Sequence, residues 1–161
     1  MTESPNPTGP HVGLFATCLV DLMRPNVGFS AARLLERAGC RVSVPETQTC
    51  CGQPAYNAGD NADARAIAAN TMAAFAPFDY VVAPSGSCAA MIRVHYPQLF
   101  ADDPEKFVLA QSISAKTYEL TSFLSDVMKT TDIKGKYSGT VTYHDGCSGR
   151  REMGVVEQPR A

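Results

Sequence analysis

The chain has 161 residues, of which 45% are hydrophobic and 19% charged. It is therefore long and apolar enough for one domain with a real core, which excludes a disordered or fibrous protein. Fourteen basic and 16 acidic side chains give a net charge of -2 without any basic block, which argues against nucleic acid as a partner. We expect no membrane span and no signal peptide, a cytoplasmic location, and a flexible N-terminus over residues 1–10.

The first half of the chain predicts a strand, a helix and a second strand. The apolar run His11–Thr17 is typical of a buried strand. Apolar residues recur at close to helical spacing over Pro25–Ala38, and Gly39 follows as a C-cap. Arg41–Val44 predicts the second strand, which ends at Pro45.

The second half continues the alternation of helix and strand. An alanine-rich helix is predicted over Asp60–Ala76, with Asp60 or Asn61 as its N-cap, and a strand over Asp79–Ala83. The other expected elements are a helix at Ser87–Tyr96, a surface loop at Phe100–Glu105, one long or two short helices within Gln111–Lys129, and a strand at Gly139–Tyr143. Strands separated by helices favour an α/β fold with an open parallel sheet and helices on both faces.

Four of the six cysteines follow predicted strands. Cys18 comes after the first strand, Cys50 and Cys51 lie in the loop after the second, and Cys88 follows the third. Because the carboxyl ends of parallel strands lie along one edge of the sheet, where ligands usually bind, these four cysteines should meet there. Cys40 matches no such position, and we expect it in the core.

The chemistry of these thiols favours a metal centre. Without an export signal, disulfides are less expected than metal ligation, catalysis or simple burial. The adjacent pair Cys50 and Cys51 would form a strained disulfide, so it is better suited to offer two thiolates to one centre. Four thiolates suit an iron-sulfur cluster or a structural zinc. The absence of paired Cys-x-x-Cys knuckles favours iron and sulfur, and Gly52 would let the backbone approach a bulky cluster.

The sequence also contains a short internal similarity. The stretches VGLFATC (12–18) and TVTYHDGC (140–147) both lead from an apolar strand into a cysteine. If Cys147 opens a second copy, the equivalent of Cys88 would fall beyond Ala161, so we expect the chain to be a fragment of a longer protein. Cys147 is then expected to be a further metal ligand in an incomplete second site.

The cysteine pattern resembles the cysteine-rich CCG domain of iron-sulfur oxidoreductases. The resemblance lies in Cys18, Cys50-Cys51-Gly52 and Cys88. Within that family, the stretches FATCLVDLMRP, QTCCGQPAYNAG, VVAPSGSCAAMI and VTYHDGC are similar to the small iron-sulfur subunit of bacterial L-lactate oxidation systems. The resemblance implies a first CCG domain over residues 11–138 and the start of an incomplete second CCG repeat over 139–161.

The resemblance also implies a function. It places a four-iron (4Fe-4S) cluster on Cys18, Cys50, Cys51 and Cys88. The chain would be an electron-transfer subunit in the oxidation of L-lactate to pyruvate, with other iron-sulfur and accessory subunits as partners. Met91 stands three residues after Cys88, where relatives have a fifth cysteine, which favours a simple four-thiolate site over a double cluster.

Other functions remain open at this stage. The chain could be the iron-sulfur subunit of a glycolate oxidase or of a heterodisulfide-reductase-like complex. It could also be a zinc-stabilised interaction module without a redox role, which would be colourless and unchanged by dithionite. In a further alternative the fragment binds no metal, because the site needs the missing half.

Overall fold

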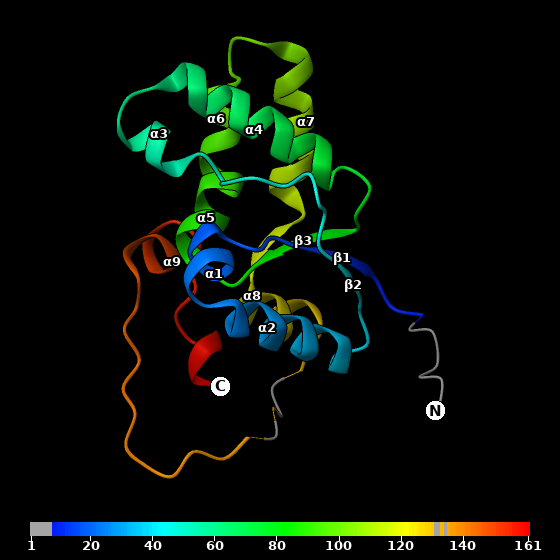
Figure 1. Cartoon of the computed structure of the whole chain (residues 1–161), viewed down its shortest axis with the longest axis vertical. Helices are drawn as coiled ribbons and strands as arrows, with labels where there is room; N and C mark the ends of the chain where they lie inside the picture. Colours follow the sequence, from blue (N-terminus) through cyan, green and yellow to red (C-terminus); the bar gives the residue numbers. More distant parts are fainter. Residues whose placement is uncertain (1–7, 131–132, 134) are drawn as a thin grey trace.

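The fold is an open parallel sheet of four strands in the order β2-β1-β3-β4 (Figure 1). The computed structural model describes residues 8–130, 133 and 135–161, so most of the expected flexible N-terminus lies outside the described residues. The strands are β1 (His11–Leu14), β2 (Arg41–Ser43), β3 (Tyr80–Ala83) and β4 (Thr117–Glu119). All three pairings are parallel, which confirms the predicted fold class.

The helices fall between and after the strands. Their bounds are α1 (Cys18–Met23), α2 (Pro25–Arg37), α3 (Gln53–Asn57), α4 (Asn61–Phe75), α5 (Gly86–Ala90), η1 (Met91–His95), α6 (Tyr96–Leu99), α7 (Pro104–Ala115), α8 (Leu120–Ser122), η2 (Phe123–Val127), α9 (Cys147–Arg151) and η3 (Gln158–Arg160). The predicted caps are confirmed, since the Asp60 carboxylate accepts from the Asp63 amide at 3.1 Å and Gly39 follows α2 with a φ of 93°. None of the helices in the described part of the chain is long and apolar enough to cross a membrane.

Two hydrophobic cores cover the two faces of the sheet. Successive side chains of a strand point to opposite faces, and β3 shows this directly. Val81 and Ala83 pack into the core formed with α4, α5, α6 and α7, whereas Val82 packs into the core formed with α2 and η2. Figure 1 shows these two helical layers above and below the sheet. Helices therefore lie on both faces, as predicted.

The fourth strand is not the predicted one. Residues 139–143 form no strand, and the side chains of Val141 and Tyr143 are exposed. The fourth strand is β4, which interrupts the helix predicted within Gln111–Lys129. The Thr117 hydroxyl donates to the Ile113 carbonyl at 2.7 Å, and Thr117 pairs with Val81 of β3. Pairing with the edge of an existing sheet thus overrides the helical pattern at this point.

Three smaller differences concern helix ends and loops. Phe100 is buried, and Pro104 already begins α7, so the predicted surface loop Phe100–Glu105 is shorter than expected. The helix predicted at Ser87–Tyr96 runs on through α5, η1 and α6 to Leu99. The short helices α1 and α3 were not predicted.

The C-terminal segment packs against the helix that carries Cys88. Helix α9 lies beside α5, where a Cβ atom built on Gly86 would come within 2.7 Å of the Gly149 Cα. Val155 is buried, and the Arg160 guanidinium donates to both carboxylate oxygens of Asp145 at 2.6 and 3.0 Å. The division into a first domain (11–138) and a second repeat (139–161) stays a prediction.

Candidate metal centre

The four predicted ligands come from three connections that follow β1, β2 and β3. Cys18 begins α1, Cys50 and Cys51 lie between β2 and α3, and Cys88 lies in α5. Their exposure rises in the order Cys51 (3%), Cys88 (8%), Cys50 and Cys18, of which Cys50 is half-buried and Cys18 exposed. The thiols therefore extend from the core to the surface.

Local structure fixes the direction of each connection. The Thr17 hydroxyl accepts from the Val20 amide at 3.2 Å and starts α1 directly at Cys18. Gly52 has a φ of 83°, a left-handed conformation that favours glycine and turns the chain into α3 right after the cysteine pair. The Ser85 hydroxyl accepts from the Cys88 amide at 3.5 Å and caps α5.

Cys51 and Cys88 form a buried pair. The Cys51 thiol donates a hydrogen bond to the Cys88 sulfur, and this bond is the main reason why the pKa of Cys88 falls to about 7. Burial opposes that decrease, while hydrogen bonds from Ser85 and Ser87 add to it. The same bond, together with burial, raises the pKa of Cys51. The hydrogen bond between them thus shifts the pKa values of the two thiols in opposite directions.

Cys18 and Cys50 form the outer pair. Burial and the neighbouring Cys50 raise the pKa of Cys18, and Cys88 contributes in the same direction. Both side chains line a cavity of about 350 Å³ between α1 and the segment that follows β2. Cys50 also packs against the core cluster that contains Cys51 and Cys88, so it links the outer pair to the inner pair.

The donor set consists of four cysteine thiols from three connections of the sheet. Among the described residues, no three or more His, Cys, Asp or Glu side chains are arranged to hold one metal ion. A structural zinc needs four donors around one ion, at about 2.3 Å for sulfur. A four-iron cluster instead presents a larger body that four thiolates surround.

Two polar side chains hold the connections in place. The buried Tyr96 hydroxyl donates to the Cys51 carbonyl oxygen at 2.9 Å, and burial raises the pKa of this tyrosine. The Gln53 amide donates to the Ser87 carbonyl at 3.5 Å and links the cysteine loop to α5. Tyr96 was not predicted as a site residue, although it lies about two helical turns after Cys88, a spacing that places both on one side of a helix.

We expect Tyr96→Phe to lower the free energy of unfolding by about 1–2 kcal/mol, because the phenylalanine ring fills the same space but donates no hydrogen bond to Cys51. Urea unfolding of the metal-free protein measures this difference. Tyr137→Phe is the matched control, since Tyr137 is 75% exposed and its hydroxyl loss should leave stability unchanged. Equal midpoints for the two variants would contradict the assigned role of Tyr96.

The remaining thiols lie apart from this group. Cys40 is buried in the core with α2, as predicted, with its sulfur 3.8 Å from that of Met128. Cys147 begins α9, is exposed, and lines a cavity of about 300 Å³ together with Ser85 and Ser87. In the described contacts Cys147 joins none of the four sulfurs, so its role as a ligand stays a prediction. Met91 is fully buried and fills the core.

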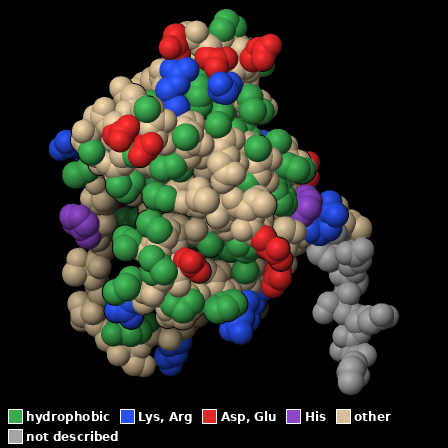
Figure 2. Space-filling model, turned by 45° about the horizontal axis from the view of Figure 1, so that its top comes forward, with side chains coloured by type: hydrophobic (Ala, Val, Ile, Leu, Met, Phe, Trp, Pro, Cys, Tyr) green, Lys and Arg blue, Asp and Glu red, His purple; other side chains and the backbone are tan. Residues whose placement is uncertain are grey.

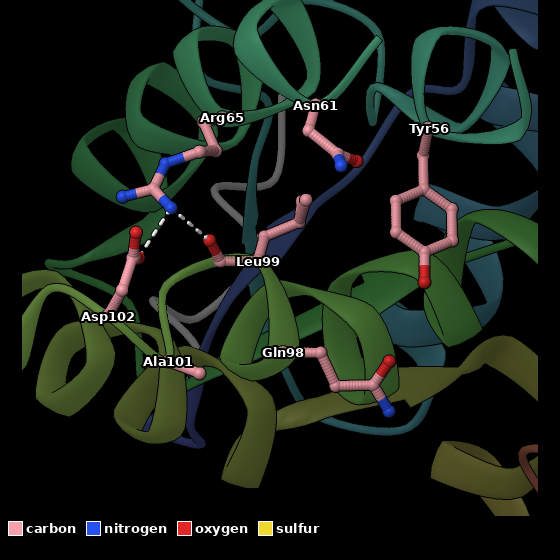
Figure 3. Close-up of a pocket in the computed structure, with 7 residues that line it drawn as sticks. All are labelled: Tyr56, Asn61, Arg65, Gln98, Leu99, Ala101 and Asp102. Carbon is pink, nitrogen blue, oxygen red and sulfur yellow. Dashed lines mark hydrogen bonds and ion pairs between the residues drawn. The ribbon is translucent and has the colours of Figure 1, made fainter. Parts of the chain in front are cut away.

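A larger cavity, of about 670 Å³, lies away from the cysteines (Figure 3). Arg65 reaches into it, but this guanidinium already donates to the Leu99 carbonyl at 2.7 Å and pairs with Asp102 at 2.5 Å. Tyr56, which also lines the cavity, stacks against His95 with ring centroids 4.8 Å apart. Because none of the six cysteines lines it, this cavity adds nothing to the candidate metal centre.

The thiol arrangement and the α/β fold define a cysteine-rich domain protein. The model of the cysteine-rich domain family, CCG, matches residues 12–93, so the chain belongs to that family. No solved structure matches the chain.

Curated relatives share the name lactate utilization protein A. The chain is 51% identical to those of Geobacillus kaustophilus (strain HTA426) and Geobacillus thermodenitrificans (strain NG80-2), and 47% identical to that of Bacillus cytotoxicus. Each alignment covers 92% of this chain and 62% of the relative. The chain thus spans about three fifths of the length of these relatives.

Proposed function

We propose that Cys18, Cys50, Cys51 and Cys88 hold a 4Fe-4S cluster, and that the chain is an iron-sulfur electron-transfer subunit of an L-lactate oxidation system. The observation that carries the proposal is the placement of four thiols on three connections of the sheet, with Cys51 and Cys88 in one core cluster and Cys18 and Cys50 lining one cavity. Membership of the cysteine-rich domain family supports the cofactor. The name of the relatives supports lactate as the substrate of the system.

The residues of the chain divide the work of holding such a group. A bound cluster supplies reversible one-electron transfer. The buried thiols of Cys51 and Cys88 would hold such a group from the core, and the exposed thiol of Cys18 would hold it from the surface. Hydrogen bonds from the hydroxyls of Ser85 and Ser87 to the Cys88 sulfur would tune the potential. The hydrogen bonds of Tyr96 and Gln53 hold the segments that carry Cys51 and Cys88 in their relative positions.

The wider system follows from the same proposal. The partners would be other iron-sulfur and accessory subunits, and the protein would work in the cytoplasm, where thiols stay reduced. Cys147 would serve a second metal site in a longer protein. Oxidation of lactate to pyruvate releases two electrons and two protons, and a one-electron group held by this chain would pass the electrons on singly.

The test is an absorption spectrum of anaerobically purified protein, with analysis of iron, zinc and sulfide. The proposal expects broad visible absorbance that dithionite bleaches, with iron and sulfide in equal amounts. Colourless protein with stoichiometric zinc would overturn it in favour of a structural module. Colourless protein that takes up no metal after anaerobic reconstitution would also overturn it for this chain. Addition of L-lactate and then glycolate to the assembled system distinguishes the two substrates.

A further inference from the structure

An apolar surface lies next to the outer cysteine. Leu19, Leu22 and Met23 of α1 are at least 70% exposed, and Phe29 of α2 is 69% exposed. Monomeric proteins seldom expose large apolar side chains in groups, and such patches usually mark interaction sites. Figure 2 shows hydrophobic side chains spread over the face it presents, with charged side chains between them. We call Leu19, Leu22, Met23 and Phe29 the α1 surface.

The charged side chains that line the cavity beside the α1 surface are both acidic. Leu22 belongs to the α1 surface and also lines the cavity that contains Cys18 and Cys50. Its other lining residues include the carboxylates Asp21 and Glu46, and no Lys, Arg or His. The Gln48 amide also lines this cavity, and its oxygen Oε1 is buried without a hydrogen-bond donor among the described residues. Among its lining residues, the cavity therefore has no positively charged side chain that could donate hydrogen bonds to these acceptors.

We propose that the α1 surface docks a partner redox protein, which inserts a lysine or arginine side chain into the cavity beside Cys18. This inference rests on the proposed function and names where its electron partner binds. An ammonium or guanidinium group would pair with Asp21 and Glu46, while apolar side chains of the partner would cover the α1 surface. In each transfer one electron would leave the reduced cluster, and the partner's own flavin or iron-sulfur group would gain it.

Charge favours such a partner over a second copy of the chain. In a two-fold symmetric dimer, the same surface meets itself. Two α1 surfaces facing each other would bring the Asp21 and Glu46 carboxylates of both copies together, and like charges across an interface are unfavourable. A basic partner instead complements the cavity, and a small apolar contact around an exposed redox centre is typical of transient electron-transfer complexes.

Photo-crosslinking of the full chain in its own host tests the proposal. The probe is p-benzoylphenylalanine at position 22, and the control carries it at position 108, where Val108 of α7 is also well exposed (65%). We expect position 22, but not 108, to capture one redox protein, with the linked residue close to a lysine or arginine in that protein. Capture of a second copy, or no product beyond the control, would overturn the proposal.

Charge neutralisation provides the second readout. Asp21→Asn with Glu46→Gln should lower the yield from position 22 roughly twofold to fivefold for each pair lost, and added salt should lower the yield of the unsubstituted chain. Glu105→Gln, on exposed α7, is the matched control and should change nothing. A yield that depends on neither charge nor salt would overturn the proposed lysine or arginine.

The outcome separates this inference from the proposed function, because the same preparation is examined for its spectrum. A protein with a dithionite-sensitive cluster but no capture at position 22 keeps its proposed function and loses this docking site. A protein without iron loses the proposed function whatever the crosslink shows.

Discussion

Replacement of Cys51 by serine is expected to reduce the iron and sulfide content of the protein to near zero. Cys51 is the most buried of the four thiols, at 3% exposure, and its sulfur contacts that of Cys88. A serine hydroxyl has the same shape but is a smaller, hard, un-ionised oxygen donor, whereas iron-sulfur clusters are held by soft thiolates. Iron and sulfide analysis after anaerobic reconstitution, together with the visible spectrum, measures the loss.

Cys40→Ala is the control for Cys51→Ser. Cys40 is also fully buried, but it lies in the other core, beside Met128. Its replacement should cost about 1 kcal/mol of folding free energy through lost packing and leave the iron content unchanged. If Cys51→Ser retained its iron, or if Cys40→Ala lost it, the assignment of the ligands would be wrong.

Phe123→Ala is expected to lower the free energy of unfolding by about 3–5 kcal/mol, the range for deletion of a buried aromatic ring. Phe123 is fully buried and meets Tyr80 and Tyr118 edge-to-face, with ring centroids 5.1 and 5.8 Å apart. The ring therefore ties η2 to β3 and β4. Urea unfolding of the metal-free protein measures the change.

Phe29→Ala provides the matched surface comparison. The Phe29 side chain is 69% exposed, so its truncation should change stability by no more than about 0.5 kcal/mol. A loss at Phe123 no greater than that at Phe29 would mean that the core beneath β3 and β4 does not hold the fold together.

The first three strands could be predicted because their signal is local. Each is a short apolar run with a helical pattern on one or both sides, and such a pattern leaves few folds open. The fourth strand could not be predicted, because Thr117–Glu119 becomes a strand only through its pairing with β3. Conversely, residues 139–143 alternate like a strand but find no strand partner in the described fold. A sequence with strand propensity forms a strand only where another strand is available to pair with it.

The candidate site, like the sheet, could be predicted from the sequence only in part. The parallel topology alone predicts that Cys18, Cys51 and Cys88 approach one another, because the connections that carry them all begin at the same edge of the sheet. The groups around them depend on tertiary contacts that no spacing reveals. The carboxylates of the outer cavity come from α1 and from the segment after β2, and α1 itself is too short, and too exposed along its apolar residues, to give a helical signal.

The contact between α5 and α9 tolerates an added side chain at Gly149 but not at Gly86. An added methyl group at Gly86 would collide with the backbone at 2.7 Å, whereas one at Gly149 would meet its nearest neighbour at an ordinary 3.8 Å. The C-terminal side of this contact can therefore vary in sequence, while the side that bears Cys88 cannot. A methyl group added at residue 86 would push α9 away from α5, the helix that carries Cys88.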